Sequence, residues 1–497
     1  MGAVRGVLLD ESLLCAEDND GNTHFLPGAE ALLRRLQYSK LHTGISYGEG
    51  ASSQKVAFLA RVATAYSFDS IVLNASCIDD TFNRMLVAWS GIGETCVYVT
   101  SKKDEGLFLR LKQCWKIIVK SGEDVARENT GVLFINKLEE LPITLCRFSK
   151  MAVRDTSVVT VGYVMKPSRE EDFSKRGAFP MYPTQNGLMF VPLTFDLPLA
   201  SQIQKVDVIL HKATDEIVSV DPGSFLDFSK GISFSKGMQE LERYIEDRPD
   251  CCVIDPLNSI YPLLDRLRIH HILLGLEDLN TKSGCRIRAP HFLKVDYFHE
   301  QNLAERLLEA QLYFPNIVKP QVACGVADAH SMAIVFRTED FKDLRVPLPA
   351  IVQEYIDHSS LLFKFYVLGE KVFHAVKKSM PNADVLLSSS EKNGFQPIIF
   401  DSLKSLPTDN NKGQHSGNTN KQSIDVDLVT DAANWLRGRL GLTIFGFDVV
   451  VQEGSRDHVI VDVNYLPSFK EIPDNVVIPA FWDAIKSSYE LRKDKYE

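Results

Sequence analysis

Two acidic residues and an amide near the end of the chain have the types and spacing of a metal site. Residues 445–467 hold two β-branched runs separated by a polar turn around Ser455, so this segment is predicted to form a β-hairpin. A turn centred on Ser455 places Asp448 directly opposite Asp462, and Asn464 then lies on the same face. Facing carboxylates among valines repel each other unless a cation lies between them, and two acids with an amide suit Mg²⁺. A solvated hairpin face that carries three polar residues is the alternative.

A second predicted hairpin carries two lysines on one face. Gly369 and Glu370 suit a two-residue turn between the runs LLFKFYVL and KVFHAVKK. This register pairs Lys377 with Leu362, so Lys377 and Lys364 share a face. Two lysines held close together on a sheet repel each other unless an anion lies between them. The pattern therefore favours a phosphate site over a solvated face.

A loop upstream of this hairpin has groups that could cover phosphates. Lys319 ends an apolar run, the following loop carries Gly325 and His330, and a second apolar run comes next, which predicts strand, loop and strand. A flexible loop flanked by cationic groups can fold over phosphates. The signal is weak by itself, because a single histidine is more often an ordinary loop residue.

The start of the chain contains another arrangement of reactive residues. An apolar strand ends at Asp10, and the helix AEALLRRLQ and the strand HTGISYG with Ser46 follow. This order resembles haloacid-dehalogenase-type phosphatases, in which the first aspartate is the nucleophile and a second, two positions on, is the general acid and base. Ser12 occupies that second position, and the acidic pair of the family's late metal motif is missing. We therefore expect a structural or regulatory domain and not a working phosphatase.

The elements that must position these residues alternate between strands and helices. Residues 1–150 predict a doubly wound parallel sheet, and a second open α/β layer is predicted from about residue 157. A helix is predicted over 263–274 with Arg266 and Arg268 on its polar side, where a solvated helix face is the commoner role for arginine.

The last third of the chain contains an unusual polar stretch between ordered elements. Residues 383–423 are rich in Gly, Asn and Ser and poor in apolar periodicity, so they predict a mobile insertion. An amphipathic helix that ends near Gly441 is expected after it, then the hairpin with the acids, then a C-terminal helix from Pro479.

Composition limits the classes of function. The chain has 497 residues, 45% of them hydrophobic, which is enough for several domains with real cores. A net charge of -10 argues against a general nucleic-acid binder. Nine cysteines without a CxxC pair indicate neither a zinc site nor a disulfide framework, which fits a reducing compartment. No signal-peptide pattern and no apolar run of membrane-spanning length are found, so neither secretion nor membrane insertion is expected.

From about Val158 onward, ordered motifs resemble those of the inositol tris/tetrakisphosphate kinases, an ATP-grasp family. They are VGY, HKATD, YIEDRP, DPL, LLDR, VKP, HSMAIVF, VQEYIDH, FKFYVLGE, IFGFD and VDVNYLP. With the dehalogenase-like domain in front of it, the chain is similar to the plant type-4 members. The resemblance implies an α/β protein in which a doubly wound dehalogenase-like domain at 1–150 precedes an ATP-grasp kinase at 157–497. The kinase would consist of an N-terminal subdomain at 157–260 and the central and C-terminal subdomains at 261–497.

The resemblance also implies roles for individual residues. The metal ligands would be Asp448, Asp462 and Asn464, and the catalytic residues His330 and Lys364. The nucleotide-binding residues would be Arg266, Lys319, Gln353, Glu354, Tyr355, Lys364 and Ser379. The substrate-binding residues would be Arg169, His211, Lys212, His330, Lys377, Asn464 and Ser468.

The chain departs from the family pattern mainly among the substrate-binding residues. The stretch KPSREED places Lys166 and Arg169 beside three acids where the family has a lysine-rich segment. Lys377 stands where arginine is usual and loses the bidentate fork for phosphate. Ser468 replaces a glycine that lets the backbone approach the inositol ring. These departures affect substrate choice more than the binding of ATP and metal.

The expected function is Mg²⁺-dependent transfer of the γ-phosphoryl group of ATP to an inositol polyphosphate. It would be of the inositol 1,3,4-trisphosphate 5/6-kinase and inositol tetrakisphosphate 1-kinase type. We expect a cytosolic or also nuclear monomer with no nucleic-acid or membrane partner. An ATP-grasp carboxylate ligase is one alternative; it would share the metal and nucleotide residues but not HKATD and VQEYIDH. A non-catalytic inositol phosphate sensor is the other, and the intact acids count against it.

Overall fold

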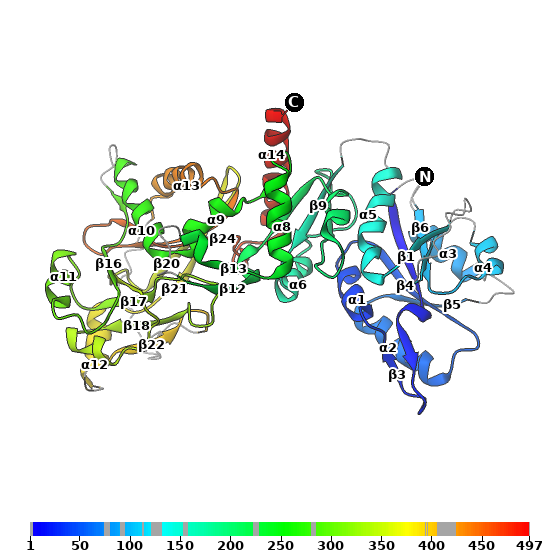
Figure 1. The fold of residues 1–497 in the computed structure, drawn as a ribbon, viewed down its shortest axis with the longest axis horizontal. Coiled ribbons are helices and arrows are strands. Elements are labelled where there is room, and N and C mark those ends of the chain that lie inside the picture. The colour runs from blue at the N-terminus through cyan, green and yellow to red at the C-terminus, as the bar shows by residue number, and fades with distance from the viewer. Residues whose placement is uncertain are drawn as a thin grey trace, which may run out of the picture. The chain divides into compact units, whose positions relative to one another are not determined.

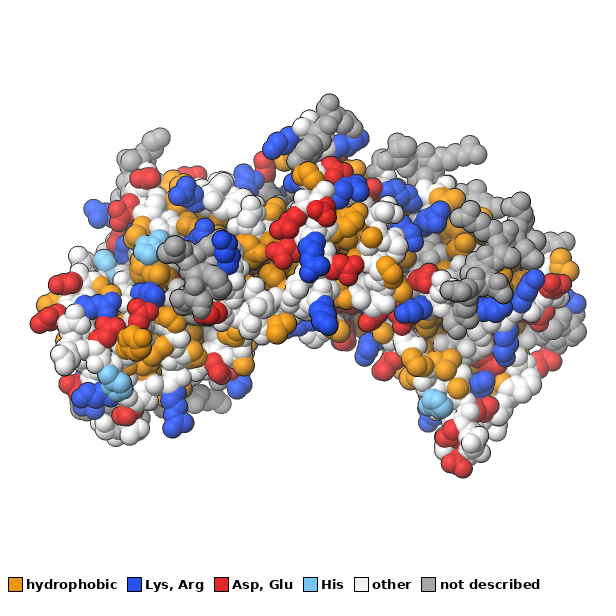
Figure 2. All heavy atoms as spheres, in the orientation of Figure 1, with side chains coloured by type: hydrophobic (Ala, Val, Ile, Leu, Met, Phe, Trp, Pro, Cys, Tyr) orange, Lys and Arg blue, Asp and Glu red, His pale blue; other side chains and the backbone are white. Residues whose placement is uncertain are grey.

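The computed structural model describes residues 3–73, 80–89, 95–111, 114–120, 132–152, 158–221, 228–279, 285–392, 394, 396–404 and 424–496. The chain forms two compact units (Figure 1). The first consists of Met1–His211, Arg243–Val253 and Tyr489–Glu497, and the second of Lys212–Glu242 and Ile254–Ser488. Acidic and basic side chains are interspersed over the face shown in Figure 2. Within the described ranges, no helix has both the length and the apolar character needed to cross a membrane.

The first unit begins with the expected doubly wound parallel sheet. Its strands lie in the order β5 (Asp69–Leu73), β4 (His42–Gly48), β1 (Val4–Asp10), β6 (Thr95–Thr100), β7 (Cys114–Val119) and β8 (Val132–Ile135). The central strand β1 is apolar and largely buried, as expected for a parallel strand covered on both faces. Its helices are α1 (Ala29–Gln37), α2 (Ser53–Tyr66), α3 (Asp80–Trp89), α4 (Glu105–Arg110) and α5 (Leu141–Ala152), with short helices η1 (Glu11–Leu13) and η2 (Leu138–Glu140). The short strands β2 (Cys15–Glu17) and β3 (Thr23–Phe25) pair separately.

The second α/β layer follows where the sequence predicted it. Its strands lie in the order β10 (Leu188–Pro192), β9 (Val159–Val164), β11 (Val208–His211) and β14 (Cys252–Ile254). Strand β9 pairs in parallel with both β10 and β11. The helices of this layer are α6 (Pro167–Lys175) and α7 (Leu199–Ile203), and α8 (Lys236–Asp247) contributes residues to both units.

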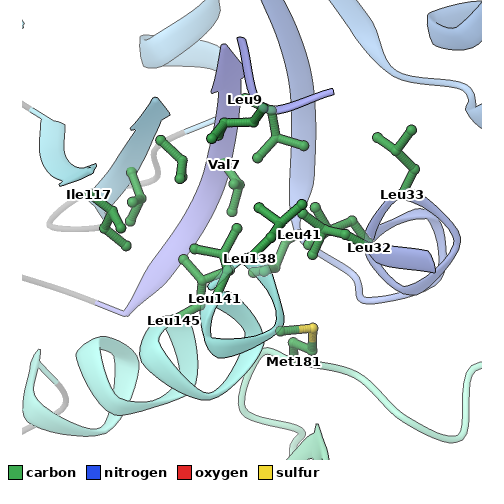
Figure 3. Packing of buried hydrophobic residues seen from close by; sticks show 14 of the residues in the cluster. Val7, Leu9, Leu32, Leu33, Leu41, Ile117, Leu138, Leu141, Leu145 and Met181 are labelled. Carbon is green, nitrogen blue, oxygen red and sulfur yellow. The ribbon is translucent and has the colours of Figure 1, made fainter. Parts of the chain in front are cut away.

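The parallel sheet and the second layer of the first unit share one hydrophobic core. Figure 3 shows Val7 of β1, Leu141 of α5 and Met181 from the segment before β10 around this core, and all three are buried. An ion pair also joins the two parts, since Arg35 Nε of α1 lies 2.9 Å from Glu170 Oε1 of α6. The six-stranded parallel sheet and its helices are therefore packed against the layer that follows them.

The second unit contains two larger sheets. One has the order β15 (Ile287–Arg288), β24 (His458–Tyr465), β23 (Ile444–Val451), β20 (Leu361–Leu368) and β21 (Lys371–Lys378). The other has the order β16 (Phe292–Val295), β19 (Ala350–Glu354), β17 (Asn316–Pro320), β18 (Ser331–Val335) and β22 (Ile398–Asp401). The strands β12 (Ile217–Val220) and β13 (Ile232–Phe234) form a separate pair. The helices are α9 (Leu257–Leu264), α10 (Arg266–Leu273), α11 (Leu303–Glu309), α12 (Ala383–Lys392) and α13 (Val426–Leu440), with short helices η3 (Ala213–Glu216), η4 (Phe228–Gly231), η5 (Leu274–Leu279) and η6 (Thr338–Asp343). Helix α14 (Asp474–Tyr496) begins in this unit, and its residues from Tyr489 on belong to the first.

The prediction of one helix over 263–274 is wrong. Helix α9 ends at Leu264 and helix α10 begins at Arg266. Asp265 separates them because its carboxylate accepts a hydrogen bond of 2.9 Å from the backbone N–H of Leu267 and so caps α10. Arg266 is buried, whereas Arg268 is exposed, so the solvated role fits Arg268 alone.

The prediction of a mobile insertion is wrong for its first part. Residues 383–392 form α12, in which Leu386 is buried in a cluster that includes Ile317 and Phe336. Strand β22 pairs antiparallel with β18. These few apolar contacts were too sparse to show a periodicity in the sequence. Residues 405–423 of the predicted insertion lie outside the described residues.

Candidate functional site

The hairpin predicted to carry the metal ligands is formed by β23 and β24. Asp448 pairs directly with Asp462, as predicted, and Gly446 pairs with Asn464. The Asn464 side-chain amide donates a hydrogen bond of 2.9 Å to Asp462 Oδ2. Two carboxylates and one amide therefore meet on one face of the sheet.

A β-bulge produces this pairing. On the turn side of Asp448 the register shifts, so that Val449 pairs with Ile460 and Val461 has no partner in the ladder. The turn is thus centred between Gly454 and Ser455, and not on Ser455. The extra residue in β24 restores the predicted pairing; without it, Asp448 would face Val461.

Strand β20 adds a cation beside the acids. Lys364 pairs directly with Asp448, and Lys364 Nζ lies 3.7 Å from Asp448 Oδ2. Burial raises the pKa of Asp448 to about 6, with Lys364 lowering it and Asp462 raising it further. Lys364, Asp448 and Asp462 form a row across the sheet in which one cation faces two anions.

The neighbouring row consists of Tyr366, Gly446 and Asn464. A Cβ on Gly446 would lie 2.9 Å from the carbonyl oxygen of Phe365 and 3.1 Å from Pro467 Cγ. Only glycine leaves room for Pro467 above the sheet at this point. The chain that leaves β24 can therefore pass over the face that holds the candidate metal ligands.

Lys319 of β17 connects the two larger sheets of the second unit. Its Nζ donates hydrogen bonds of 2.8 Å to Gln353 Oε1 and 3.3 Å to the carbonyl oxygen of Val461. Val461 is the bulged residue, so its carbonyl is available for this contact. Burial lowers the pKa of Lys319 to about 8, although Asp462 and Asp448 act in the opposite direction. The predicted nucleotide lysine is thus placed close to the predicted metal ligands.

The histidine next to this lysine was not identified from the sequence. His270 Nε2 lies 3.2 Å from Gln353 Oε1, and His270 Nδ1 lies 2.5 Å from the carbonyl oxygen of Arg266. Both oxygens are acceptors, so a neutral ring donates a hydrogen bond to one of them. Burial and the charge of Lys319 lower the pKa of His270 to about 4. A neutral histidine therefore supports the glutamine that holds Lys319, and only the fold brings these residues together.

Arg266 organises the loop between β17 and β18. Its buried guanidinium donates to backbone carbonyl oxygens at distances of 2.6 to 3.4 Å, namely those of Pro320, Val322, Ala323 and Ala329. His330 at the end of this loop has its Nδ1 3.2 Å from Ser402 Oγ. Burial and Arg266 lower the pKa of His330, whereas Asp401 and Asp462 raise it. Both residues lie near the acids, and their predicted contacts with ATP and substrate remain predictions.

The residues assigned to adenine have partners within the protein. Glu354 forms an ion pair with Arg288, and the hydroxyl of Tyr355 donates to the carbonyl oxygen of Pro381. Ser379 is buried directly after β21. Their role in holding adenine remains a prediction.

The two lysines assigned to substrate binding, Lys212 and Lys377, lie in the second unit. Lys212 Nζ donates to the carbonyl oxygen of Tyr465, next to Asn464, and lies 4.9 Å from the centroid of the Tyr465 ring. Lys377 pairs with Leu362, as predicted, so it shares a face with Lys364. The inference that these two lysines need a shared anion is not supported, because Lys377 has a carboxylate of its own, that of Glu471.

The remaining substrate assignments are only partly placed by the structure. Ser468 is half-buried in the segment after β24. Arg169 on α6 and His211 at the end of β11 belong to the first unit. Among the described residues, no group of three or more His, Cys, Asp or Glu side chains is arranged to hold a metal. The candidate metal site thus consists of two acids and the Asn464 amide.

A second polar cluster lies in the first unit at the end of β1. The Asp10 carboxylate accepts hydrogen bonds from the Ser12 hydroxyl at 2.5 Å and the Tyr98 hydroxyl at 2.9 Å. Asp10 pairs with Ser46 in the parallel sheet, so the two residues lie side by side. Both carboxylate oxygens of Asp10 therefore accept hydrogen bonds inside the domain, one of them from Ser12, the residue at the position of the family's general acid.

Family models match nearly all of the chain. The model described as ITPK4, N-terminal HAD-like domain, matches residues 1–151. The model of the inositol 1,3,4-trisphosphate 5/6-kinase pre-ATP-grasp domain matches residues 160–260, and that of the ATP-grasp domain of the same kinase matches 281–483. The predicted order of a dehalogenase-like and an ATP-grasp fold is confirmed.

The chain is also similar to individual proteins. The chain is 54% identical over 490 residues to inositol-tetrakisphosphate 1-kinase 6 of Oryza sativa subsp. japonica. The match covers 98% of this chain and 88% of the relative. It is 28% identical over 290 residues to inositol-tetrakisphosphate 1-kinase of Danio rerio, covering 58% and 69%. Among solved structures, D-alanine–D-alanine ligase from Bacillus anthracis matches with a TM-score of 0.41 and 13% identity, covering 68% of this chain and 100% of the ligase.

Proposed function

The chain belongs to the inositol 1,3,4-trisphosphate 5/6-kinase family, and we propose that it transfers the γ-phosphoryl group of ATP to a hydroxyl of an inositol polyphosphate. Asp448, Asp462 and Asn464 would hold the magnesium that this reaction uses. The observation that carries the proposal is the row of Lys364, Asp448 and Asp462, with Lys319 reaching it from the second sheet.

This arrangement suits phosphoryl transfer, in which catalysis depends on positioning and on neutralising charge. A magnesium ion held by these three side chains would keep coordination positions open for phosphate oxygens. It would neutralise part of their negative charge, since Mg²⁺ prefers oxygen ligands. Lys319 and Lys364 supply fixed positive charge from two different strands, so they can bind phosphate groups from two directions. His330 lies on the loop held by Arg266 and would stabilise charge on the transferred group.

Two alternatives remain distinct in chemistry. A carboxylate ligase of the ATP-grasp fold would use the same acids and lysines to form an acyl phosphate, and would release ADP and inorganic phosphate with a carboxylate acceptor. A non-catalytic sensor would bind inositol phosphate without consuming ATP. The family membership supports the kinase over both.

The test is a panel of inositol tris-, tetrakis-, pentakis- and hexakisphosphates incubated with the full chain and Mg-ATP. We expect ADP formation to match the appearance of a more highly phosphorylated inositol with at least one acceptor. The matched control is Asp462→Asn, which should remove this product. Binding of ATP and inositol phosphate without transfer would contradict the proposal and favour the sensor.

A further inference from the structure

Glu471 lies in the segment that follows β24 and contacts Lys377, which the family resemblance assigns to substrate binding. Its Oε1 lies 2.5 Å from Lys377 Nζ on β21. Its Oε2 accepts a hydrogen bond from the hydroxyl of Tyr366 on β20. The Lys377 side chain is nearly half-exposed, whereas that of Glu471 is mostly covered. The Lys377 ammonium group is therefore paired with a largely buried carboxylate while it is still reached by solvent.

This carboxylate lies over the same face as the predicted metal ligands. In the β20–β21 ladder, the pair of Lys364 and Ala375 lies between the level of Lys377 and that of Tyr366. Glu471 contacts both of these outer residues, so it spans the face at the level of Lys364. Since Lys364 pairs with Asp448, Glu471 is next to the row of charges where the phosphoryl group would be transferred.

The backbone holds Glu471 in this position. Leu466 and Phe469 both have φ of 40°, a left-handed conformation that bulky side chains rarely adopt unless the surroundings impose it. The ring of Phe469 is fully buried, with its centroid 6.3 Å from that of Tyr366 and 5.9 Å from that of Phe481. The segment is thus anchored in the core immediately before Glu471.

The charge of Glu471 is fixed as well. Burial raises the pKa of Glu471, but the hydrogen bonds from Lys377 and Tyr366 outweigh this effect and lower the pKa to about 2. Glu471 is therefore an anion at any pH at which a kinase would operate. A phosphate group that approaches Lys377 meets a negative charge that is already bound to it.

We propose that Glu471 is a specificity-determining residue, an internal counter-ion that a phosphate group of the inositol acceptor must displace from Lys377. This inference rests on the proposed function, because it takes an inositol polyphosphate as the ligand of this face. Acceptors that place a phosphate at Lys377 lose part of their binding energy to the displacement. Acceptors without a phosphate there do not pay this cost, so Glu471 reduces the preference for the more highly phosphorylated acceptors.

The experiment compares Glu471→Gln with the wild type over the panel of inositol phosphates at saturating Mg-ATP. Glutamine keeps the size of the side chain and an oxygen that accepts from Tyr366, but removes the charge. We expect the KM of acceptors that use Lys377 to fall about two- to fivefold, the size expected for an ion pair with a half-exposed lysine. The kcat and the KM for ATP should change less than twofold.

The same strand offers a matched control. Lys371 at the other end of β21 pairs with Asp483 of α14 at 2.7 Å, and both side chains are about half-exposed. Asp483→Asn removes one negative charge from the same sheet edge without touching Lys377. An equal fall of KM in Asp483→Asn would show a general charge effect and overturn the inference.

A double-variant cycle tests whether the effect acts through Lys377. In a Lys377→Gln background, Glu471→Gln should no longer lower the KM of any acceptor. A fall of the same size in that background, or a rise of KM in Glu471→Gln alone, would overturn the inference. A wild type that transfers nothing to any acceptor would instead refute the proposed function, and inositol phosphate binding by calorimetry would then test Glu471 alone, with the same two- to fivefold change expected in Kd.

Discussion

Replacing Lys319 by methionine separates the functional role of this lysine from its effect on stability. Methionine keeps the apolar stem of the side chain but removes the ammonium group. The hydrogen bonds from this group to Gln353 Oε1 and to the Val461 carbonyl oxygen are then lost. Hydrogen bonds from a charged group are worth about 1.5–3 kcal/mol each. If Lys319 also donates to ATP, Lys319→Met should lower kcat/KM for ATP about 10- to 100-fold, since about 1.4 kcal/mol corresponds to a factor of ten.

The free energy of unfolding should report the charge of Lys319 through its dependence on pH. Burial lowers the pKa of Lys319 from 10.5 to about 8, which corresponds to a cost on the order of 3 kcal/mol for keeping the charged form folded. The unfolded chain binds more protons between these two values, so this cost is fully present below pH 8 and disappears as pH rises from about 8 to 10.5. Methionine does not titrate, so Lys319→Met should lack this gain in stability as the pH rises from about 8 to 10.5.

The assay is ADP release with an inositol phosphate at saturation, combined with urea unfolding between pH 7 and 10. In the wild type, kcat/KM for ATP should decline above about pH 8 as free Lys319 loses its proton, and the variant should lack this decline. Lys371→Met is the control, because that lysine is half-exposed and pairs with a surface acid at the far end of β21. Activity within twofold of the wild type, with the same alkaline decline, would refute the assignment of Lys319.

Four further outcomes follow from the structure. Asp462→Asn should lower turnover about 100-fold or more with an unchanged unfolding midpoint, because phosphate stabilisation is lost; near-normal turnover in a magnesium titration would contradict the metal assignment. His270→Ala should raise the KM for ATP several-fold without changing the magnesium dependence, because Gln353 loses its support, and the KM should recover in part in His270→Gln. Asp10→Asn in the full chain should leave phosphate release from an aryl phosphate at background, since the wild type lacks the general acid that is worth about 10²- to 10⁴-fold; robust release abolished by this variant would show a second active site. Deleting residues 1–150 should lower the yield of soluble protein, because it exposes the core shared with Met181, and a soluble remainder that refolds reversibly would argue against that core.

The sequence was sufficient for features set by local pattern. Alternating apolar residues and short turns predicted both hairpins of the site, and the two-residue turn at Gly369 gave the register of β20 and β21 without error. Apolar strands alternating with helices also predicted the parallel sheet. In each of these elements, the residues that decide the structure lie within a few positions of each other.

Features that depend on tertiary contacts could not be predicted in the same way. His270 is 83 residues from Gln353 in the chain, and Glu471 is 94 residues from Lys377; nothing in their local sequence distinguishes them from surface residues. Arg266 was expected on the polar face of one continuous helix. The helix is instead broken at Asp265, which caps α10 and accepts a hydrogen bond from Gln321 after β17, and the second of these contacts cannot be read from the local sequence. A pattern of charges shows which side chains are available, but only the fold shows which of them are already paired.

The bulge at Val461 shows how one local irregularity can place two functions at once. A regular ladder from the turn would put Val461 opposite Asp448, turn Asp462 to the other face and separate the two carboxylates. The inserted residue returns Asp462 to the face of Asp448 and leaves the Val461 carbonyl outside the ladder, where Lys319 binds it. The same extra residue therefore aligns the candidate metal ligands and ties them to the candidate nucleotide lysine of the second sheet. Because both effects depend on the bulge, deleting Val461 should impair metal binding and ATP binding together. Substituting Asp462 should instead affect mainly metal binding, and substituting Lys319 mainly ATP binding.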